Sequence, residues 1–325
     1  MREGWNRATP VFQLSKKEVE TLLHPILPSL KVTEVEIAKG GLANTNLKIQ
    51  RAEEEQPLLL RFCVRDPSSV VREFRLLELV GAAVAAPHIW HFSRENPING
   101  HPFILMDWID GVRLETVIDR LSREEIWQLG ESLGETLAAI HGFKFEQAGF
   151  FDEKLDITSP MEMNGAGLLA YARQCLADAV AVERLGWQLA TELLKFLEEE
   201  NSLLNEWDGK PCLTHADFNG SNILVKNAPE GWKVAAVLDW EFAFSGTPFF
   251  DFGNLLRDPL GALPGMADSV ASGYTKAGGI LPEKWRKMSK LTDLTAWLEF
   301  LTRENTGPQL ISDCRDQISK TIGKW

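Results

Sequence analysis

Three polar residues at fixed spacing, His215, Asp217 and Asn222, could take part in phosphoryl transfer, and they read as H-x-D-x-x-x-x-N. An aspartate at position 217 could orient an acceptor hydroxyl and take its proton. Asn222, together with Asp239 at the end of a following apolar stretch, could hold Mg²⁺ on the phosphates of ATP. The chemistry depends mostly on positioning and charge neutralisation, so several oxygen ligands must converge on one phosphate.

The sequence around these residues predicts a β-hairpin that would hold them. Ile223–Val225 is apolar and largely β-branched, Asn227–Gly231 has turn chemistry, and Trp232–Leu238 is again strand-like. The plainer interpretation is a polar loop in which Asp217 caps a turn and Asn222 takes a left-handed conformation. A lone H-x-D is common, but its combination with the third polar residue and the flanking strands favours a phosphoryl-transfer site.

A glycine-bearing segment between two predicted strands could contact the phosphates. It contains Gly40 and Gly41, followed by Asn44, Thr45 and Asn46. Glycines let the backbone approach a phosphate, and the hydroxyl and amide groups can add hydrogen bonds. Two glycines between strands also suit a plain hairpin, so this prediction depends on the downstream motif. The segment matches neither a P-loop nor a dinucleotide-binding fingerprint.

Arg61 stands inside the apolar run Leu58–Val64, where an unpaired cation would be costly. Glu73, on the next predicted helix, is its expected partner, and Arg61 could then reach the α- and β-phosphates. Glu78 on the same helix competes for that partnership. The alternative is that Arg61 faces solvent from an edge strand.

The elements that must position these residues change in type near residue 108. The pattern of residues 1–107 predicts an antiparallel sheet with one inserted helix, Ser69–Val80. A short helix, which begins at a capping box at Ser15, comes before this sheet. The predicted strands are Lys31–Ala38, Asn46–Gln50, Leu58–Val64, His88–Phe92 and Phe103–Trp108.

Residues 108–325 predict a mainly helical region that carries the hairpin. Within it, 143–160 reads as irregular and 168–204 as two helices broken near Gly186. The other predicted helices are Arg123–His141, Ala267–Ala277, Glu283–Arg303 and Gln309–Ile322. The expected fold class is therefore α+β, with two lobes, 1–107 and 108–325, that face each other across a cleft.

Composition narrows the class of partner. The chain has 325 residues, of which 44% are hydrophobic and 25% charged, as is ordinary for a soluble globular protein. Its 34 basic and 46 acidic residues give a formal charge of −12, which argues against nucleic acid as a partner. The overall field also repels ATP, so nucleotide binding must depend on Mg²⁺ and a few local cations.

The four cysteines are far apart in sequence and form no C-x-x-C pair, which argues against a metal cluster or a disulfide framework. The first residues lack an apolar signal core, and no stretch approaches the apolar length that spans a bilayer. We therefore expect a cytoplasmic protein with no membrane partner.

With these residues placed, the chain resembles the aminoglycoside phosphotransferase and choline kinase group of kinase-like enzymes. The most specific likeness is Leu213–Val225 followed by Val237-Leu-Asp-Trp-Glu241, because that group commonly has D-W-E where protein kinases have D-F-G. Arginine in place of lysine at Arg61 also fits. Further likeness lies in Leu105–Gly111 and Leu137–His141, within a resemblance that runs from about Val32 to Leu256.

The resemblance implies a protein-kinase-like fold in which Asp217 is the catalytic base and His215 braces its loop. It also implies that Asn222 and Asp239 bind Mg²⁺. The acceptor would be a hydroxyl of a small molecule such as choline, homoserine, a sugar or another alcohol. The closing helices, where this group builds its acceptor pockets, resemble nothing assignable, so the acceptor itself stays open.

In such a fold Phe103–Gly111 joins the lobes, and backbone groups at Asp107 and Ile109 would contact the adenine of ATP. Asp251-Phe-Gly253 spells D-F-G, but it comes twelve residues after Asp239, which already stands at the end of the hairpin. We therefore expect Asp251 to hydrogen-bond the backbone of the catalytic loop instead.

Two other hypotheses stay open. One is a catalytically silent, kinase-like module that only binds nucleotide. The other is a protein kinase, although the chain has no recognisable A-P-E after the metal motif and has a helical insert at about 145–205. The sequence leaves open the choice between ATP and GTP and the oligomeric state.

Overall fold

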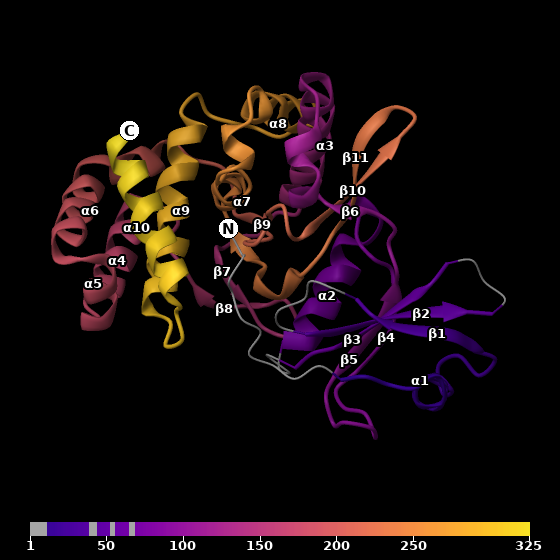
Figure 1. Ribbon diagram of the computed structural model, residues 1–325. Coiled ribbons are helices and arrows are strands. Elements are labelled where there is room, and N and C mark those ends of the chain that lie inside the picture. Colours follow the sequence, from indigo (N-terminus) through magenta and orange to yellow (C-terminus); the bar gives the residue numbers. More distant parts are fainter. Residues whose placement is uncertain (1–11, 39–43, 53–55, 65–68) are drawn as a thin grey trace.

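The computed structural model describes residues 12–38, 44–52, 56–64 and 69–325, which form two lobes (Figure 1). An antiparallel sheet with helix α2 makes up most of the first lobe, whereas helices dominate the second. This architecture confirms the predicted α+β class with a sheet-rich N-terminal part and a helical C-terminal part.

The sheet of the first lobe has the strand order β1-β2-β3-β5-β4, and every neighbouring pair is antiparallel. On one face, α1 (Lys16–Leu23) shares an apolar cluster with Leu47. On the other face, α2 (Val70–Val80) shares a cluster with Ile104. The strands are β1 (Val32–Ile37), β2 (Thr45–Arg51), β3 (Leu58–Phe62), β4 (Ile89–Ser93) and β5 (Phe103–Asp107).

The helices of the second lobe bury one large apolar core. Helices α3 and α8 cross closely at Gly134, where an added Cβ would lie only 2.0 Å from the carbonyl oxygen of Val270. Among the described residues, no helix is both long and apolar enough to cross a membrane. The helices are α3 (Arg123–His141), α4 (Gly165–Leu176), α5 (Ala179–Leu185), α6 (Trp187–Glu200), α7 (Pro248–Leu255), α8 (Met266–Lys276), α9 (Trp285–Thr302) and α10 (Pro308–Gly323).

Two small antiparallel sheets in the second lobe hold the candidate site, in the orders β11-β10-β6 and β8-β7-β12-β9. Strand β9 leads directly into His215, and β12 leads through Thr247 into α7. The strands are β6 (Val112–Arg113), β7 (Gly149–Phe151), β8 (Ile157–Pro160), β9 (Cys212–Thr214), β10 (Ile223–Ala228), β11 (Gly231–Val237) and β12 (Phe244–Gly246).

Some predicted elements of the second lobe were wrong. Residues 143–160 are not irregular, because β7 and β8 form there and pair with each other. The break at Gly186 is confirmed, with φ of 94°, but 168–204 holds a second break where Asp178 caps α5. The predicted turn Asn227–Gly231 is shorter than expected, because β10 continues to Ala228.

Candidate active site

The catalytic loop brings Asp217 and Asn222 into direct contact. The side-chain amide of Asn222 donates to the Asp217 Oδ2 at 2.6 Å and to the Asp217 backbone carbonyl at 3.0 Å. Asn219 donates to the other carboxylate oxygen, Oδ1, at 2.6 Å. Both oxygens of Asp217 are thus held by neutral amides, which fixes the orientation of the carboxylate without neutralising its charge.

The pairing of β10 with β11 carries Asp239 to the same place. Ile223 lies opposite Val237, and the amide of Leu238 donates to the carbonyl of Asn222 at 2.8 Å. Asp239 follows at once in a left-handed conformation, with φ of 62° and ψ of 64°. A non-glycine residue in that conformation turns the chain sharply, so Asp239 leaves the strand next to the catalytic loop.

Arg61 ties Asp239 to the first lobe. Its Nη1 lies 2.8 Å from Glu73 Oε1, and its Nη2 lies 2.8 Å from Asp239 Oδ1. The predicted partnership with Glu73 is confirmed, because the competing Glu78 instead contacts Arg75. The edge-strand alternative was wrong, since β3 lies between β2 and β5 and Arg61 is only 6% exposed.

Burial and nearby charges have opposite effects on the pKa values of Arg61 and Glu73. Burial raises the pKa of Glu73 to about 7, and Arg61 only partly offsets it, because Asp239 and Glu241 add negative charge nearby. Burial lowers the pKa of Arg61, but Glu73 and Asp239 outweigh it, so that pKa stays above its ordinary value. The permanently charged guanidinium of Arg61 therefore interacts with the carboxyl groups of both Glu73 and Asp239.

We expect this arrangement to make stability depend on pH. In the folded protein the pKa of Glu73 is about 7, so the carboxyl keeps its proton up to about that pH, whereas the ordinary pKa is 4.5. The resulting stabilisation is complete below pH 4.5 and is lost as pH rises to about 7, because the unfolded chain binds fewer protons there. The free energy of unfolding, measured against pH, should show this fall in the wild type but not in Glu73→Gln. Parallel curves for the two proteins would contradict the raised pKa.

Two buried polar atoms beside this pair are suited to a nucleotide. Arg61 Nε and Asn46 Oδ1 are buried and have no hydrogen-bond partner within the described part of the chain. Asn46 and Arg61 lie opposite each other on β2 and β3, so both side chains project from the same face. Buried polar groups rarely stay unpaired, and here a phosphate oxygen could accept from Arg61 Nε while a ribose hydroxyl could donate to Asn46 Oδ1.

The side chains of the other residues predicted to contact phosphate have partners within the protein or lie outside the described residues. Asn44 accepts from the Val64 amide at 3.1 Å, and Thr45 accepts from the Phe12 amide at 3.3 Å, so both side chains contact the protein backbone. Gly40 and Gly41 lie outside the described residues.

The linker between the lobes is held by the sheet at Asp107, whose amide donates to the His88 carbonyl at 2.9 Å. Its carboxylate accepts from Trp90 Nε1 at 2.7 Å. Ile109 instead borders a hollow of about 470 Å³, which is lined by Gln56, Trp108, Ile109, Asp110, Lys226 and Ala235. Contact of this linker with adenine stays a prediction.

His215 braces the catalytic loop from its side chain. Its Nε2 donates to the Leu238 carbonyl at 2.9 Å, so its Nδ1 is the acceptor for the Asp217 amide at 3.2 Å. The ring also packs against Trp240, with 4.7 Å between ring centroids. His215 thereby joins the residue before Asp239 to Asp217.

Asp251 holds the same loop through its backbone amides. Its two carboxylate oxygens accept from the amides of His215 and Ala216, each at 2.8 Å. The predicted supporting role of Asp251 is confirmed. His141 Nε2 also lies 3.1 Å from this carboxylate, and its Nδ1 lies 3.1 Å from the Tyr274 hydroxyl. No local sequence pattern predicts these contacts, because His141 lies 110 residues from Asp251 and 133 residues from Tyr274.

The donor set fits Mg²⁺ only together with a nucleotide. The amide nitrogen of Asn222 is used by Asp217, which leaves its oxygen, with the carboxylate of Asp239, as hard ligands. The described residues contain no group of three or more His, Cys, Asp or Glu that could hold a metal alone. The remaining ligands would therefore come from phosphates and water, as is usual for Mg²⁺.

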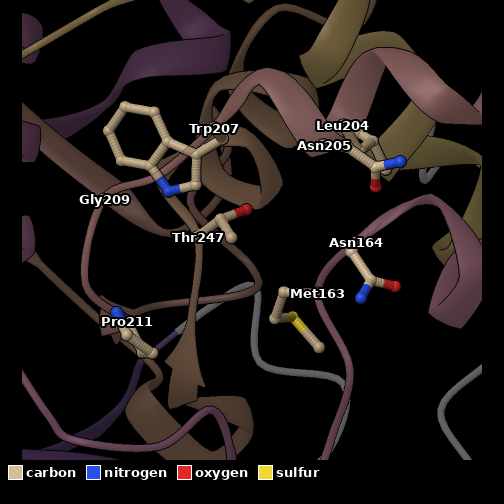
Figure 2. A pocket seen from close by; sticks show the side chains of 8 residues that line it. All are labelled: Met163, Asn164, Leu204, Asn205, Trp207, Gly209, Pro211 and Thr247. Carbon is tan, nitrogen blue, oxygen red and sulfur yellow. The ribbon is translucent and has the colours of Figure 1, made fainter.

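A separate cavity of about 410 Å³ lies away from this chemistry (Figure 2). Pro211 comes before β9 and Thr247 comes after β12, and both line it. Asp217 follows the opposite end of β9, so this cavity and the catalytic loop lie at opposite ends of one small sheet. Its other lining residues are Met163, Asn164, Leu204, Asn205, Trp207 and Gly209.

Comparisons with known proteins show the family and agree with the observed fold. A profile of the family described as "Phosphotransferase enzyme family" matches residues 34–291. The structure of a GDP complex of wild-type aminoglycoside 2'-phosphotransferase-IIIa aligns with a TM-score of 0.72 at 16% identity, over 96% of this chain and 99% of that one. A macrolide 2'-phosphotransferase from Brachybacterium faecium aligns with a TM-score of 0.62 at 16% identity, over 94% and 97%.

Curated sequences add a different kind of relative. Acyl-CoA dehydrogenase family member 11 of Mus musculus is 27% identical over 270 residues, which cover 76% of this chain and 31% of that protein. Family member 10 of the same species is 26% identical over 190 residues, or 56% and 16%. The chain thus spans less than a third of the length of these relatives.

Proposed function

We propose that this chain, which belongs to the phosphotransferase enzyme family, transfers the γ-phosphate of Mg²⁺-bound ATP to a hydroxyl of a small molecule. The observation that carries the proposal is the contact of Asp217 with Asn222 at the strand end from which Asp239 emerges. These three oxygen-bearing groups would supply the base and the two metal ligands that phosphoryl transfer needs.

In the proposed mechanism, Asp217 orients the acceptor hydroxyl and takes its proton, since its carboxylate is partly exposed and held by two amides. Arg61 turns from Asp239 toward the phosphates while Glu73 keeps it in place. Asn222 and Asp239 would hold Mg²⁺, which supplies positive charge to the phosphates. His215 and Asp251 keep the loop rigid, so that little reorganisation is needed at the moment of transfer.

Replacing Asp239 with alanine is expected to weaken Mg·ATP binding by more than the roughly 10–100-fold that loss of a metal's second-shell partner costs. The measurement is the rise in melting temperature on titration with ATP, with Mg²⁺ and with EDTA in parallel. The wild type should show a larger rise with Mg²⁺, and the variant should show no such difference. Equal Mg²⁺-dependent rises in both proteins would remove Asp239 from the metal site.

The acceptor is best sought with a panel scored by acceptor-dependent ADP release. Amino-alcohols, sugars, amino acids and aminoglycosides represent the alcohols used across such enzymes. A hydroxylated acyl thioester belongs in the panel because of the names of the curated relatives. GTP should be run beside ATP. No nucleotide-dependent rise in melting temperature and no ADP release with any acceptor would overturn the proposal.

A further inference from the structure

We infer that the acceptor has an apolar alkyl or aryl portion, which packs against three phenylalanines beside the catalytic loop. This inference rests on the proposed function and narrows its substrate class. The three residues, called here the phenylalanine wall, are Phe150 on β7, Phe244 on β12 and Phe250 on α7.

The three rings of the wall contact one another in sequence, and the wall is exposed to solvent mainly at Phe150. The ring centroids of Phe150 and Phe244 are 5.6 Å apart, and those of Phe244 and Phe250 are 5.0 Å apart. Phe244 is buried behind the other two, whereas Phe150 is 52% exposed. Among the residues that the structure describes, none of the three belongs to the main apolar clusters of the two lobes. Their packing therefore serves this surface and not a core.

Strand pairing places the wall at the end of the small sheet where the catalytic loop begins. Phe244 lies opposite Thr214, the last residue of β9 before that loop. Strand β7 lies on the other side of β12, where Gly149 pairs with Ser245. Two strand spacings separate β7 from β9, so Phe150 lies about 10 Å to the side of Thr214. An acceptor whose hydroxyl reaches Asp217 could extend along the sheet to this ring.

The opposite faces of these strands explain which way the wall faces. Leu213 on β9 belongs to the core of the second lobe, and Ser245, its partner on β12, is fully buried. Because neighbouring residues in a strand point to opposite faces, Phe244 and Phe150 point away from that core. The short distance between their rings agrees with this direction.

The chemistry of the wall favours an apolar ligand. A half-exposed phenylalanine backed by a second ring gains most when an alkyl or aryl group removes it from water. Sites for quaternary ammonium ions surround the cation with several ring faces. Here Phe244 and Phe250 meet edge to face, with an interplanar angle of 85° and ring centroids 5.0 Å apart, so these two rings pack against each other and leave no room for a cation between them.

The experiment compares matched acceptors in the full chain. 4-Phenyl-1-butanol and 1-octanol serve as apolar probes, and choline, glucose and kanamycin as polar ones, each scored by acceptor-dependent ADP release. The apolar probes should be turned over by the wild type. In Phe150→Ala their kcat/KM should fall about tenfold, the loss expected for part of one aromatic contact, while Phe150→Leu should recover most of it. The KM for ATP should not change.

Trp187→Ala is the matched control, because Trp187 is an aromatic residue, 77% exposed, on the distant helix α6. It should behave as the wild type. Ligand-observed NMR of 4-phenyl-1-butanol gives a readout independent of turnover, and its signal should weaken in Phe150→Ala alone. Turnover confined to the polar probes, or apolar probes that neither bind nor respond to Phe150→Ala, would overturn the inference. If Mg·ATP raised the melting temperature in that case, the proposed phosphotransferase function would still stand.

Discussion

Replacing Asp217 with alanine is expected to lower the turnover number by roughly 10²–10⁴, the usual contribution of a positioned acid–base group. The variant should still bind Mg·ATP, because Asn222, Asp239 and Arg61 remain. The acceptor-dependent rate of ADP release, measured at saturating ATP, tests the first statement. The rise in melting temperature with Mg·ATP tests the second.

A control variant separates the carboxylate from the shape of its loop. Asn219→Ala removes one of the two amides that hold Asp217 but keeps the carboxylate, so it should cost much less turnover. A wild-type rate for Asp217→Ala would show that the proton leaves by another route. Loss of both turnover and nucleotide binding would instead indicate that the loop had collapsed.

Replacing Asp251 with alanine is expected to lower the free energy of unfolding by about 3–5 kcal/mol, since buried donors lose their acceptor. The carboxylate is fully buried and accepts from the amides of His215 and Ala216, with His141 beside it. Each donor left without a partner costs about 1–3 kcal/mol. Urea denaturation of wild type and variant gives the difference.

The matched control for this substitution is Asp316→Ala, which removes an exposed aspartate from helix α10. It should change the free energy of unfolding by no more than about 0.5 kcal/mol. If Asp251→Ala were equally mild, the two amides must find other acceptors, and the catalytic loop would not depend on α7.

The site was predictable where its geometry follows from local sequence. His215, Asp217 and Asn222 lie within eight residues, and the hairpin that returns the chain to Asp239 has a clear pattern of apolar strands around a turn. A cation in an apolar strand must find a carboxylate, which led to Glu73. That Arg61 also reaches Asp239 could not be predicted, because it depends on how the two lobes meet.

Contacts between distant segments were the part that sequence patterns missed. His141 meets Asp251 across 110 residues and Tyr274 across 133, and neither contact leaves a periodic signal. Strand β7 was missed for the same reason. It has only three residues, too few for alternation to be visible, and its partner β12 lies nearly a hundred residues later.

The double contact of Arg61 has a consequence for the order of events in the cleft. Arg61 lies on β3 of the first lobe and Asp239 follows β11 of the second, so their ion pair works as a clasp between the lobes. If Asp239 holds a divalent ion, as proposed above, that ion would compete with the Arg61 guanidinium for the carboxylate, while Glu73 keeps Arg61 anchored. Metal binding at Asp239 would therefore weaken this ion pair between the lobes, so nucleotide loading and the freedom of the lobes to move apart would be linked.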